Sequence, residues 1–234
     1  MAVLLLRLAG PLQSWGDSSR FIRRDTRREP SKSGVIGMIA AALGRNRGED
    51  VSDLAALEMA VRVDQPGEVL RDYQTARVPG AKNSMLSNRY YLADATFLVA
   101  LAGEKDSLCA IRDALTAPRW PLYLGRRSCP ADLPLVKDLL LDQDDPRTVL
   151  SAYPWVASDW YQSRNNPKWL GMVCDGRDGE ICEGRSDFPL SFDNLGQRSY
   201  AVRAVYSTRV MNPSYCEPEH DPMDFDEGED HVHY

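Results

Sequence analysis

Histidine is nearly missing from this sequence, which has only His220, His231 and His233, all close to the C-terminus. Nucleolytic enzymes usually recruit histidine as a general acid and base. A terminal segment with no packing around it is a poor place for a preorganised catalyst. The sequence therefore gives no positive sign of catalysis, and we expect no catalytic residue.

Paired cysteines are also lacking, because the five cysteines form an odd set without a CxxC pair: Cys109, Cys129, Cys174, Cys182 and Cys216. This spacing favours neither a disulfide framework nor a zinc knuckle, and it is typical of reduced cytosolic thiols. No spaced Asp/Glu motif stands out before the tail, so we expect neither a metal site nor a cofactor.

Long apolar runs are absent as well. The first run, Ala2 to Leu6, is interrupted by Arg7 and is too short for the apolar region of a signal peptide. No later run approaches the ~18 residues of a membrane span. We expect a cytoplasmic protein with no membrane partner.

Charge is present but unevenly placed. The 234 residues carry a net charge of -6, yet eight of the 34 acidic residues lie from Glu217 onward, where no Lys or Arg occurs. Without that tail, 28 basic residues face 26 acidic ones, a net of +2. Residues 7–47 hold nine basic and three acidic side chains, a local +6. Such a distribution is typical of a phosphate-binding surface.

The pattern of apolar residues predicts an α+β fold. A continuous apolar run at residues 3–6 predicts a central strand buried on both faces, and residues 33–44 predict a helix capped by Ser31 or Ser33 and ended by Gly44. Strands are expected at 59–63, 69–75, 95–101 and 199–209, and a second helix at 106–116. In the last strand, Tyr200, Val202, Ala204 and Tyr206 share one face and Ser199, Arg203, Ser207 and Arg209 share the other. This β-α-β-β-α-β order is typical of a ferredoxin-like, RNA-recognition-like sheet with two helices on one face.

The remaining segments complete the predicted domain organisation. We expect residues 1–141 to form the RNA-recognition-like domain, with residues 76–92 as an inserted, protruding hairpin tip rich in Gly, Asn, Ser and Pro. Residues 142–216 show no clean periodicity and are expected to be a loop-rich extension that completes the sheet. Residues 217–234 are expected to be a disordered acidic tail.

The first candidate site runs from Gln13 to Lys32 and leads into the N-terminus of the first predicted helix. Its arginines provide forks for phosphate, Trp15 offers a stacking platform, and a helix N-terminus favours an anion. An alternative stays open, in which the arginines are a solvated surface and Trp15 covers the core.

Two further candidate sites are weaker. The turn at residues 123–130, YLGRRSCP, can present backbone amides and guanidinium groups to one phosphate. Cys129 within it is expected to be a buried small residue, not a reactive thiol. The basic tip at 76–92, with Arg77 and Tyr90, can reach over single-stranded RNA, or can equally be a solvent loop with core tyrosines.

Four blocks in order, LRLAGPLQSWG at 6–16, PSKSGVIG at 30–37, RDYQT at 71–75 and YLGRRSCP at 123–130, resemble the CasD subunits of type I-E CRISPR surveillance complexes. That family belongs to the repeat-associated mysterious proteins, which have RNA-recognition-like folds. The resemblance covers residues 1 to about 130 and fades afterwards. It implies a non-catalytic subunit that binds the 5′ handle of the guide crRNA, with residues 76–92 as a thumb at the handle–spacer junction. The RNA-binding residues expected from the motifs and the resemblance are Gln13, Trp15, Arg24, Arg28, Ser31, Lys32, Ser33, Arg77, Tyr90, Arg126, Arg127 and Ser128.

The resemblance also implies partners: the large subunit that reads the protospacer-adjacent motif, the repeated backbone subunit, and target DNA near the assembled complex. Two other functions remain open. One is a metal-independent endoribonuclease that cuts repeat RNA, using Tyr73 or Tyr90 with Lys32. The other is a protein-only assembly scaffold whose arginines bind acidic faces of partner subunits.

Overall fold

The structure is a computed structural model of the whole chain, in which residues 1–16, 23–77, 84–193 and 198–217 are described. Its elements confirm the predicted α+β class. The strands are β1 (Ala2–Ala9), β2 (Leu12–Gln13), β3 (Arg23–Arg24), β4 (Glu58–Gln65), β5 (Glu68–Ala76), β6 (Met85–Ala93), β7 (Thr96–Gly103), β8 (Val136–Leu140), β9 (Trp169–Asp175), β10 (Glu183–Ser191) and β11 (Ser199–Met211). The helices are α1 (Lys32–Leu43), α2 (Ser52–Ala55), α3 (Lys105–Thr116), α4 (Pro146–Ala152) and α5 (Asp159–Gln162).

A seven-stranded sheet in the order β10-β11-β9-β4-β7-β1-β8 forms the centre of the molecule, and every pairing in it is antiparallel. The apolar run of β1 lies between β7 and β8, as its sequence predicted, and β7 is buried along its whole length. Continuous apolar strands arise here because both faces of the sheet are covered.

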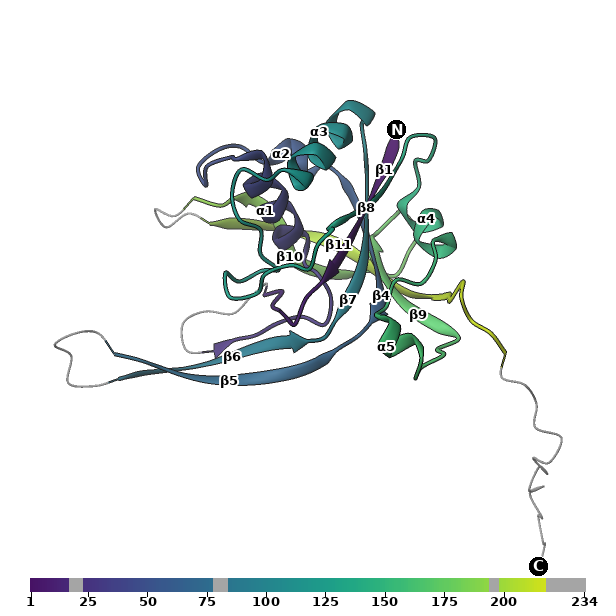
Figure 1. Cartoon of the computed structure of the whole chain (residues 1–234). Helices are drawn as coiled ribbons and strands as arrows, with labels where there is room; N and C mark the ends of the chain where they lie inside the picture. The colour runs from purple at the N-terminus through teal and green to yellow at the C-terminus, as the bar shows by residue number, and fades with distance from the viewer. Residues whose placement is uncertain (17–22, 78–83, 194–197, 218–234) are drawn as a thin grey trace, which may run out of the picture.

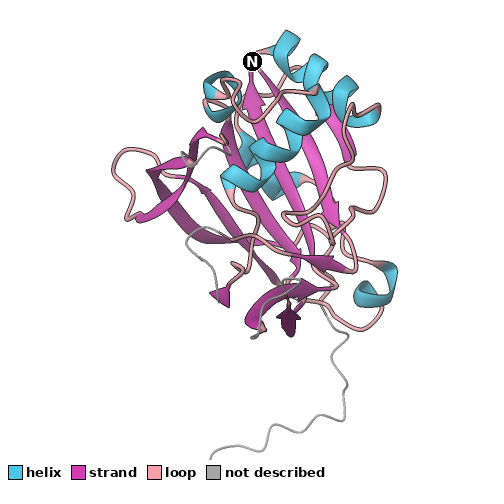
Figure 2. Cartoon of the chain, turned by 90° about the vertical axis from the view of Figure 1, so that its left-hand side faces the viewer, coloured by secondary structure: helices cyan, strands magenta, loops and turns pink. Residues whose placement is uncertain are grey.

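The two faces of the sheet are covered by different helices. Helices α1, α2 and α3 lie on one side, and α4 lies on the other (Figure 1). Figure 2 shows the helices of the first group in front of the strands. The larger core packs Leu4, Leu6 and Val99 against α1 and α3, and the smaller core packs Val3 and Leu5 against Leu150 of α4.

The boundaries of α1 follow the predicted capping residues. Ser31 Oγ accepts a hydrogen bond from the Gly34 amide at 3.3 Å, and Gly44 ends the helix with φ of 78°. A left-handed residue at this position is most readily a glycine.

The segment 76–92 is more regular than its composition suggested. Strands β5 and β6 form a long antiparallel hairpin that projects from the body of the molecule (Figure 1). Residues 85–92, which we expected in a protruding tip, are therefore part of β6, whereas residues 78–83 lie outside the described residues. The alternation of apolar residues is weak because both faces of β5 are largely exposed.

The predicted loop-rich extension is also largely regular. Residues 142–198 contain α4, α5, β9 and β10, and together with β11 they supply three of the seven strands of the sheet. The sequence of β10 lacks an alternation of apolar and polar residues because its inward side chains include Arg185 and Asp187, which are buried in ion pairs. In β11, Val202 is 68% exposed and the neighbouring Arg203 is buried.

Residues 218–234 of the predicted acidic tail lie outside the described residues. Among the helices of the described ranges, none is both long enough and apolar enough to span a membrane.

Candidate nucleic-acid interface

A cleft of about 710 Å³ lies between α1, the segment that follows α3, and the ends of β10 and β11. Its charged lining residues are all arginines: Arg45, Arg47, Arg127 and Arg198. Its large aromatic lining residues are Trp15, Trp120, Tyr123, Phe192 and Tyr200. No acidic side chain belongs to the lining within the described residues. Guanidinium groups beside aromatic rings suit a single-stranded nucleic acid, which offers phosphates and unstacked bases.

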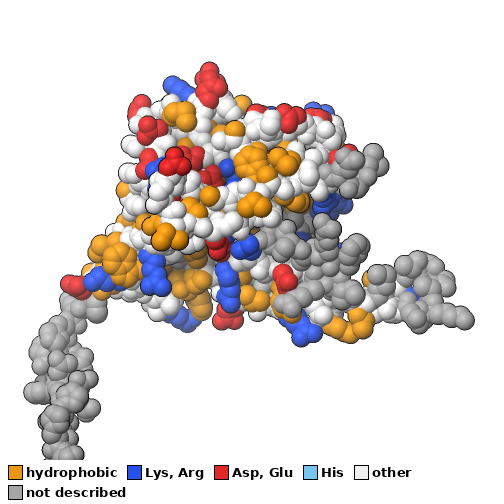
Figure 3. Space-filling model, turned by 180° about the vertical axis from the view of Figure 1, so that it is seen from behind, with side chains coloured by type: hydrophobic (Ala, Val, Ile, Leu, Met, Phe, Trp, Pro, Cys, Tyr) orange, Lys and Arg blue, Asp and Glu red, His pale blue; other side chains and the backbone are white. Residues whose placement is uncertain are grey.

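One face of the molecule has a mixed charge pattern. The face seen in Figure 3 mixes Lys and Arg side chains with Asp and Glu side chains and apolar patches. The all-arginine lining of the cleft is therefore a local feature and not a general property of this surface.

Helix α1 forms one wall of the cleft, and its glycines permit close packing. A Cβ on Gly34 would lie 2.8 Å from Cε3 of Trp15, and a Cβ on Gly37 would lie 3.6 Å from the ring of Phe192. Gly34 thus lets α1 pack directly on the Trp15 ring, next to Ser31 and Ser33 at the edge of the cleft.

Gln13 and Trp15 lie in the interior. Gln13 Nε2 donates to the carbonyls of Leu8 and Ala95 at 3.2 and 2.7 Å, and its Oε1 accepts from Trp15 Nε1 at 3.0 Å. Trp15 is only 1% exposed, so neither face of its ring is available for stacking on a base. Trp15 therefore packs in the core, which is one of the two roles that the sequence left open, and it does not stack on a base.

The N-terminus of α1 is occupied by an anion that belongs to the protein itself. The amide of Lys32 donates to Asp187 Oδ2 at 2.9 Å, and Asp187 is 1% exposed. The Lys32 side chain is also buried, with Nζ 2.8 Å from Asp175 Oδ2. The expectation that Lys32 and this helix terminus bind a phosphate is therefore wrong for this structure, because carboxylates of β9 and β10 hold both groups.

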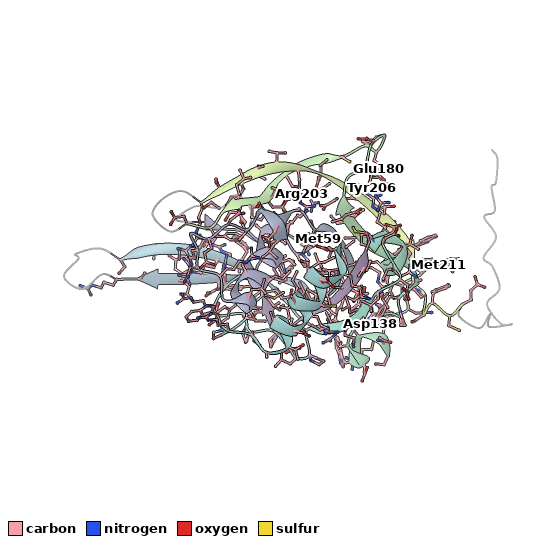
Figure 4. The ribbon with its side chains drawn as sticks, turned by 90° about the horizontal axis from the view of Figure 1, so that it is seen from above. Met59, Asp138, Glu180, Arg203, Tyr206 and Met211 are labelled. Carbon is pink, nitrogen blue, oxygen red and sulfur yellow. The ribbon has the colours of Figure 1, made fainter. Side chains whose placement is uncertain are left out.

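A buried network of charges extends from Asp175. Its Oδ2 also accepts from the Met59 amide at 3.0 Å, and its Oδ1 accepts from Arg203, which in turn pairs with Asp187 at 2.7 Å. Figure 4 shows Arg203 on β11 and Met59 on β4 in this part of the molecule. The network joins β9, β10 and β11 to the N-terminus of α1.

The basic segment before α1 leaves its predicted arginines accessible. Arg24 belongs to β3, which pairs in parallel with β6, and both Arg24 and Arg28 are exposed. The Arg27 amide donates to the Trp15 carbonyl at 2.8 Å, and the Trp15 amide donates to Thr26 Oγ1 at 2.9 Å. These bonds attach the segment to the core beside the cleft.

The Gly-Arg-Arg turn packs tightly against the same region. Gly125 has φ of 86°, and a Cβ there would lie 1.7 Å from the Ser14 carbonyl oxygen. The Ser14 amide donates to the Leu124 carbonyl at 3.1 Å. Cys129 is fully buried, and burial raises the pKa of its thiol, which confirms the structural interpretation of this cysteine.

The three polar residues of the turn differ in their surroundings. Arg127 and Ser128 are exposed, and Arg127 lines the cleft, whereas the guanidinium of Arg126 lies over the Tyr91 ring at 4.6 Å. Burial raises the pKa of the Tyr91 phenol, but hydrogen bonds from Ser128 and Arg126 outweigh it, so that the pKa is lowered from 10.0.

Two predicted residues lie on the hairpin and do not line the cleft. Arg77 is exposed just after β5, and Tyr90 is half-buried in β6, where its carbonyl accepts from Ser14 Oγ at 3.2 Å.

Comparison with known proteins shows to which family this chain belongs. A family model described as CRISPR-associated protein (Cas_Cas5) matches residues 3–208. The chain belongs to this Cas5 family. The match includes every residue that lines the cleft.

The Cas5 chain is also similar to individual proteins and solved structures. It is 37% identical, over 186 residues, to the CRISPR system Cascade subunit CasD of Escherichia coli (strain K12), covering 69% of this chain and 81% of that protein. A solved structure described as a CRISPR RNA-guided surveillance complex contains a chain with a TM-score of 0.75 and 36% identity, covering 94% of this chain and 95% of that one. A crystal structure of a Cas protein gives a TM-score of 0.73 and 40% identity, covering 90% of this chain and 95% of that one.

Several residues of the cleft in this Cas5 chain were not found from the sequence. They are Arg45, Arg47, Trp120, Phe192, Arg198 and Tyr200. Arg45 and Arg47 directly follow the Gly44 cap, and Trp120 follows α3, so arginine or tryptophan just beyond a helix end was the available signal. Phe192, Arg198 and Tyr200 carried no signal, because their approach to α1 depends on the pairing of β10 with β11.

The described part of this Cas5 chain holds no group of three or more His, Cys, Asp or Glu side chains arranged to bind a metal ion.

Proposed function

We propose that this Cas5-family chain is a non-catalytic subunit of a CRISPR RNA-guided surveillance complex and that it binds the 5′ handle of the guide crRNA in the arginine-lined cleft. The observation that carries the proposal is the lining itself: four arginines and several aromatic rings without a described acidic residue. RNA is the nucleic acid we propose, because a similar chain belongs to a solved structure described as a CRISPR RNA-guided surveillance complex.

The fold is consistent with this role. Strands β8, β1, β7 and β4 are adjacent in that order, and α1 and α3 connect them on one face. We infer that residues 2–140 are a ferredoxin-like, RNA-recognition-like unit, which has this β-α-β-β-α-β order. Residues 142–216 then act as an extension that supplies the far wall of the cleft.

The exposed residues beside the cleft extend the proposed RNA path. Arg24, Arg28, Arg127 and Ser128 are accessible, and Ser31 and Ser33 line the edge next to Gly34. Arg77 and Tyr90 form a second contact on the β5–β6 hairpin, where the RNA leaves the cleft. Gln13, Trp15 and Lys32 support this surface from inside.

The partners we propose are those that the resemblance to CasD subunits implies. They are the large subunit that reads the protospacer-adjacent motif and the repeated backbone subunit, which this chain bridges, with target DNA nearby in the assembled complex. The protruding hairpin exposes Leu70, Tyr73 and Leu86, apolar side chains that suit contact with a neighbouring subunit.

The alternative of a metal-independent ribonuclease finds little support in the geometry. It required Lys32 as a catalytic partner of Tyr73 or Tyr90, but Lys32 Nζ is held by Asp175 at 2.8 Å. An ammonium group in a buried ion pair is not free to donate a proton to RNA.

The test is to incubate the purified chain with end-labelled repeat RNA in EDTA and to resolve parallel samples on native and denaturing gels. We expect a complex on the native gel that weakens as salt rises, and intact RNA on the denaturing gel. Cleavage at one position of the repeat would establish the ribonuclease instead. Absence of any salt-dependent complex would favour the protein-only scaffold.

A further inference from the structure

Arg126 and Arg127 are neighbours in the sequence but differ in what their side chains can reach. A basic dipeptide in a glycine turn suggests two equivalent phosphate ligands. The surroundings of the two guanidinium groups show that they are not equivalent.

The guanidinium group of Arg126 is already engaged by the protein. Its Nη2 donates to the Arg24 carbonyl at 2.8 Å, and its Cζ lies over the Tyr91 ring, 4.6 Å from the ring centroid. Its Nη1 is buried and has no hydrogen-bond partner among the described residues. A bidentate phosphate contact needs two accessible nitrogen atoms of one fork. Arg126 does not present such a fork.

The contacts of Arg126 join three separate segments. The Arg24 carbonyl belongs to β3, Tyr91 belongs to β6, and Arg126 itself belongs to the turn that follows α3. β3 has only two residues and pairs with β6 through Arg23 and Arg24. A strand of two residues gains little stability from its hydrogen bonds to β6. An additional hydrogen bond from Arg126 to the Arg24 carbonyl therefore helps to hold β3 in place.

Arg127 has the opposite character. Its side chain is exposed and lines the cleft, and no ion pair with another described residue is found for it. Its guanidinium group is therefore available to a ligand.

We propose that Arg126 is a positioning residue that holds the basic segment at 23–28 against β6, and that Arg127 alone of the two contacts RNA phosphate. This assignment rests on the proposed function for Arg127, but the role of Arg126 can be measured without RNA. It predicts that lysine, which keeps the charge but not the planar fork, replaces Arg127 and does not replace Arg126.

The first experiment uses the RNA-free chain and four variants: Arg126→Gln, Arg126→Lys, Arg127→Gln and Arg127→Lys. Hydrogen exchange is followed at the Arg27 amide, which bonds to the Trp15 carbonyl at 2.8 Å and reports whether the basic segment is attached. We expect exchange at least about tenfold faster in both Arg126 variants and unchanged exchange in both Arg127 variants. Equal protection in all four variants would overturn the positioning role. The Arg126→Lys variant also provides a milder change if Arg126→Gln does not fold.

The second experiment measures RNA affinity of the same chains across a series of KCl concentrations. Arg127→Gln should reduce the slope of log K against log salt by about 0.7, the value for one phosphate contact on a single strand, and Arg127→Lys should restore it. Arg126→Lys should bind as weakly as Arg126→Gln. Recovery of wild-type affinity by Arg126→Lys would show that Arg126 is itself a phosphate ligand. If the wild-type chain shows no salt-dependent binding, the proposed function fails, while the exchange result still decides the role of Arg126.

Discussion

Asp175 connects more segments than any other carboxylate of the buried network, so its charge should contribute strongly to stability. It accepts hydrogen bonds from Lys32, from the Met59 amide and from Arg203, and the side chains of Lys32 and Arg203 are only 4% and 8% exposed. Asp175→Asn keeps the shape and removes the charge. It leaves two buried cations short of a partner, which typically costs about 3–5 kcal/mol.

Urea unfolding followed by circular dichroism measures this cost, and for a chain of this size it corresponds to a fall in Tm of roughly 6–20 °C. The matched control is Asp53→Asn, which removes an ion pair with Arg45 at 2.5 Å whose side chains are 25% and 55% exposed. The control should cost at most about 1 kcal/mol. Equal costs for the two variants would refute the reasoning.

A second variant separates the buried charge from simple loss of a contact. Adding Lys32→Met to Asp175→Asn removes one of the uncompensated cations, and we expect it to restore at least about 1 kcal/mol. A double variant less stable than Asp175→Asn would contradict this explanation.

Three further measurements test other parts of the structure. Gly125→Ala should destabilise far more than Gly179→Ala, because both residues have φ of 86° but only the first meets a carbonyl oxygen, at 1.7 Å; equal urea midpoints would contradict this. Trp120→Ala should weaken RNA binding by about 1–3 kcal/mol in a titration, whereas Trp169→Ala, equally exposed but outside the cleft, should not; equal losses would argue against stacking in the cleft. For Asp145, burial raises the pKa, but hydrogen bonds from Thr148 and Arg177 outweigh it and lower the pKa from 3.8 to about 2. The unfolded chain therefore binds a proton at this carboxylate at a higher pH than the folded chain does, and the stabilisation is lost as pH falls from about 3.8 to about 2. When urea midpoints are measured across this pH range, Asp145→Asn should make them depend less on pH. An unchanged dependence would disprove the effect.

Several elements within the first 116 residues could be predicted from the sequence because their signals are local, whereas the regular strand at residues 85–92 could not. The apolar run of β1, the Ser31 cap and Gly44 each act within a few positions, and the structure confirms all three. Residues 142–198 could not be read in the same way. Arg185 and Asp187 face inward on β10, and a pattern that assumes apolar residues inside cannot recognise a strand whose buried side chains are charged.

Contacts between residues far apart in the sequence also limited the prediction of the candidate site. The basic run and the N-terminus of α1 lie beside the cleft, but their sequence could not show that Asp187, 155 positions away, would occupy the helix terminus. Long-range pairing decided which cations face solvent. Lys32 is paired by β9, whereas Arg24 and Arg28 stay exposed beside it.

That long-range bond has a consequence for the order of synthesis. Helix α1 is made before the carboxylate that its Lys32 amide needs, and at ~5–20 residues per second the interval is roughly 8–31 s. Throughout that time the nascent chain also lacks Phe192 and Tyr200, so one wall of the cleft does not yet exist. The cleft is therefore completed only after Tyr200 has been made, and a nascent chain that ends before Phe192 lacks that wall.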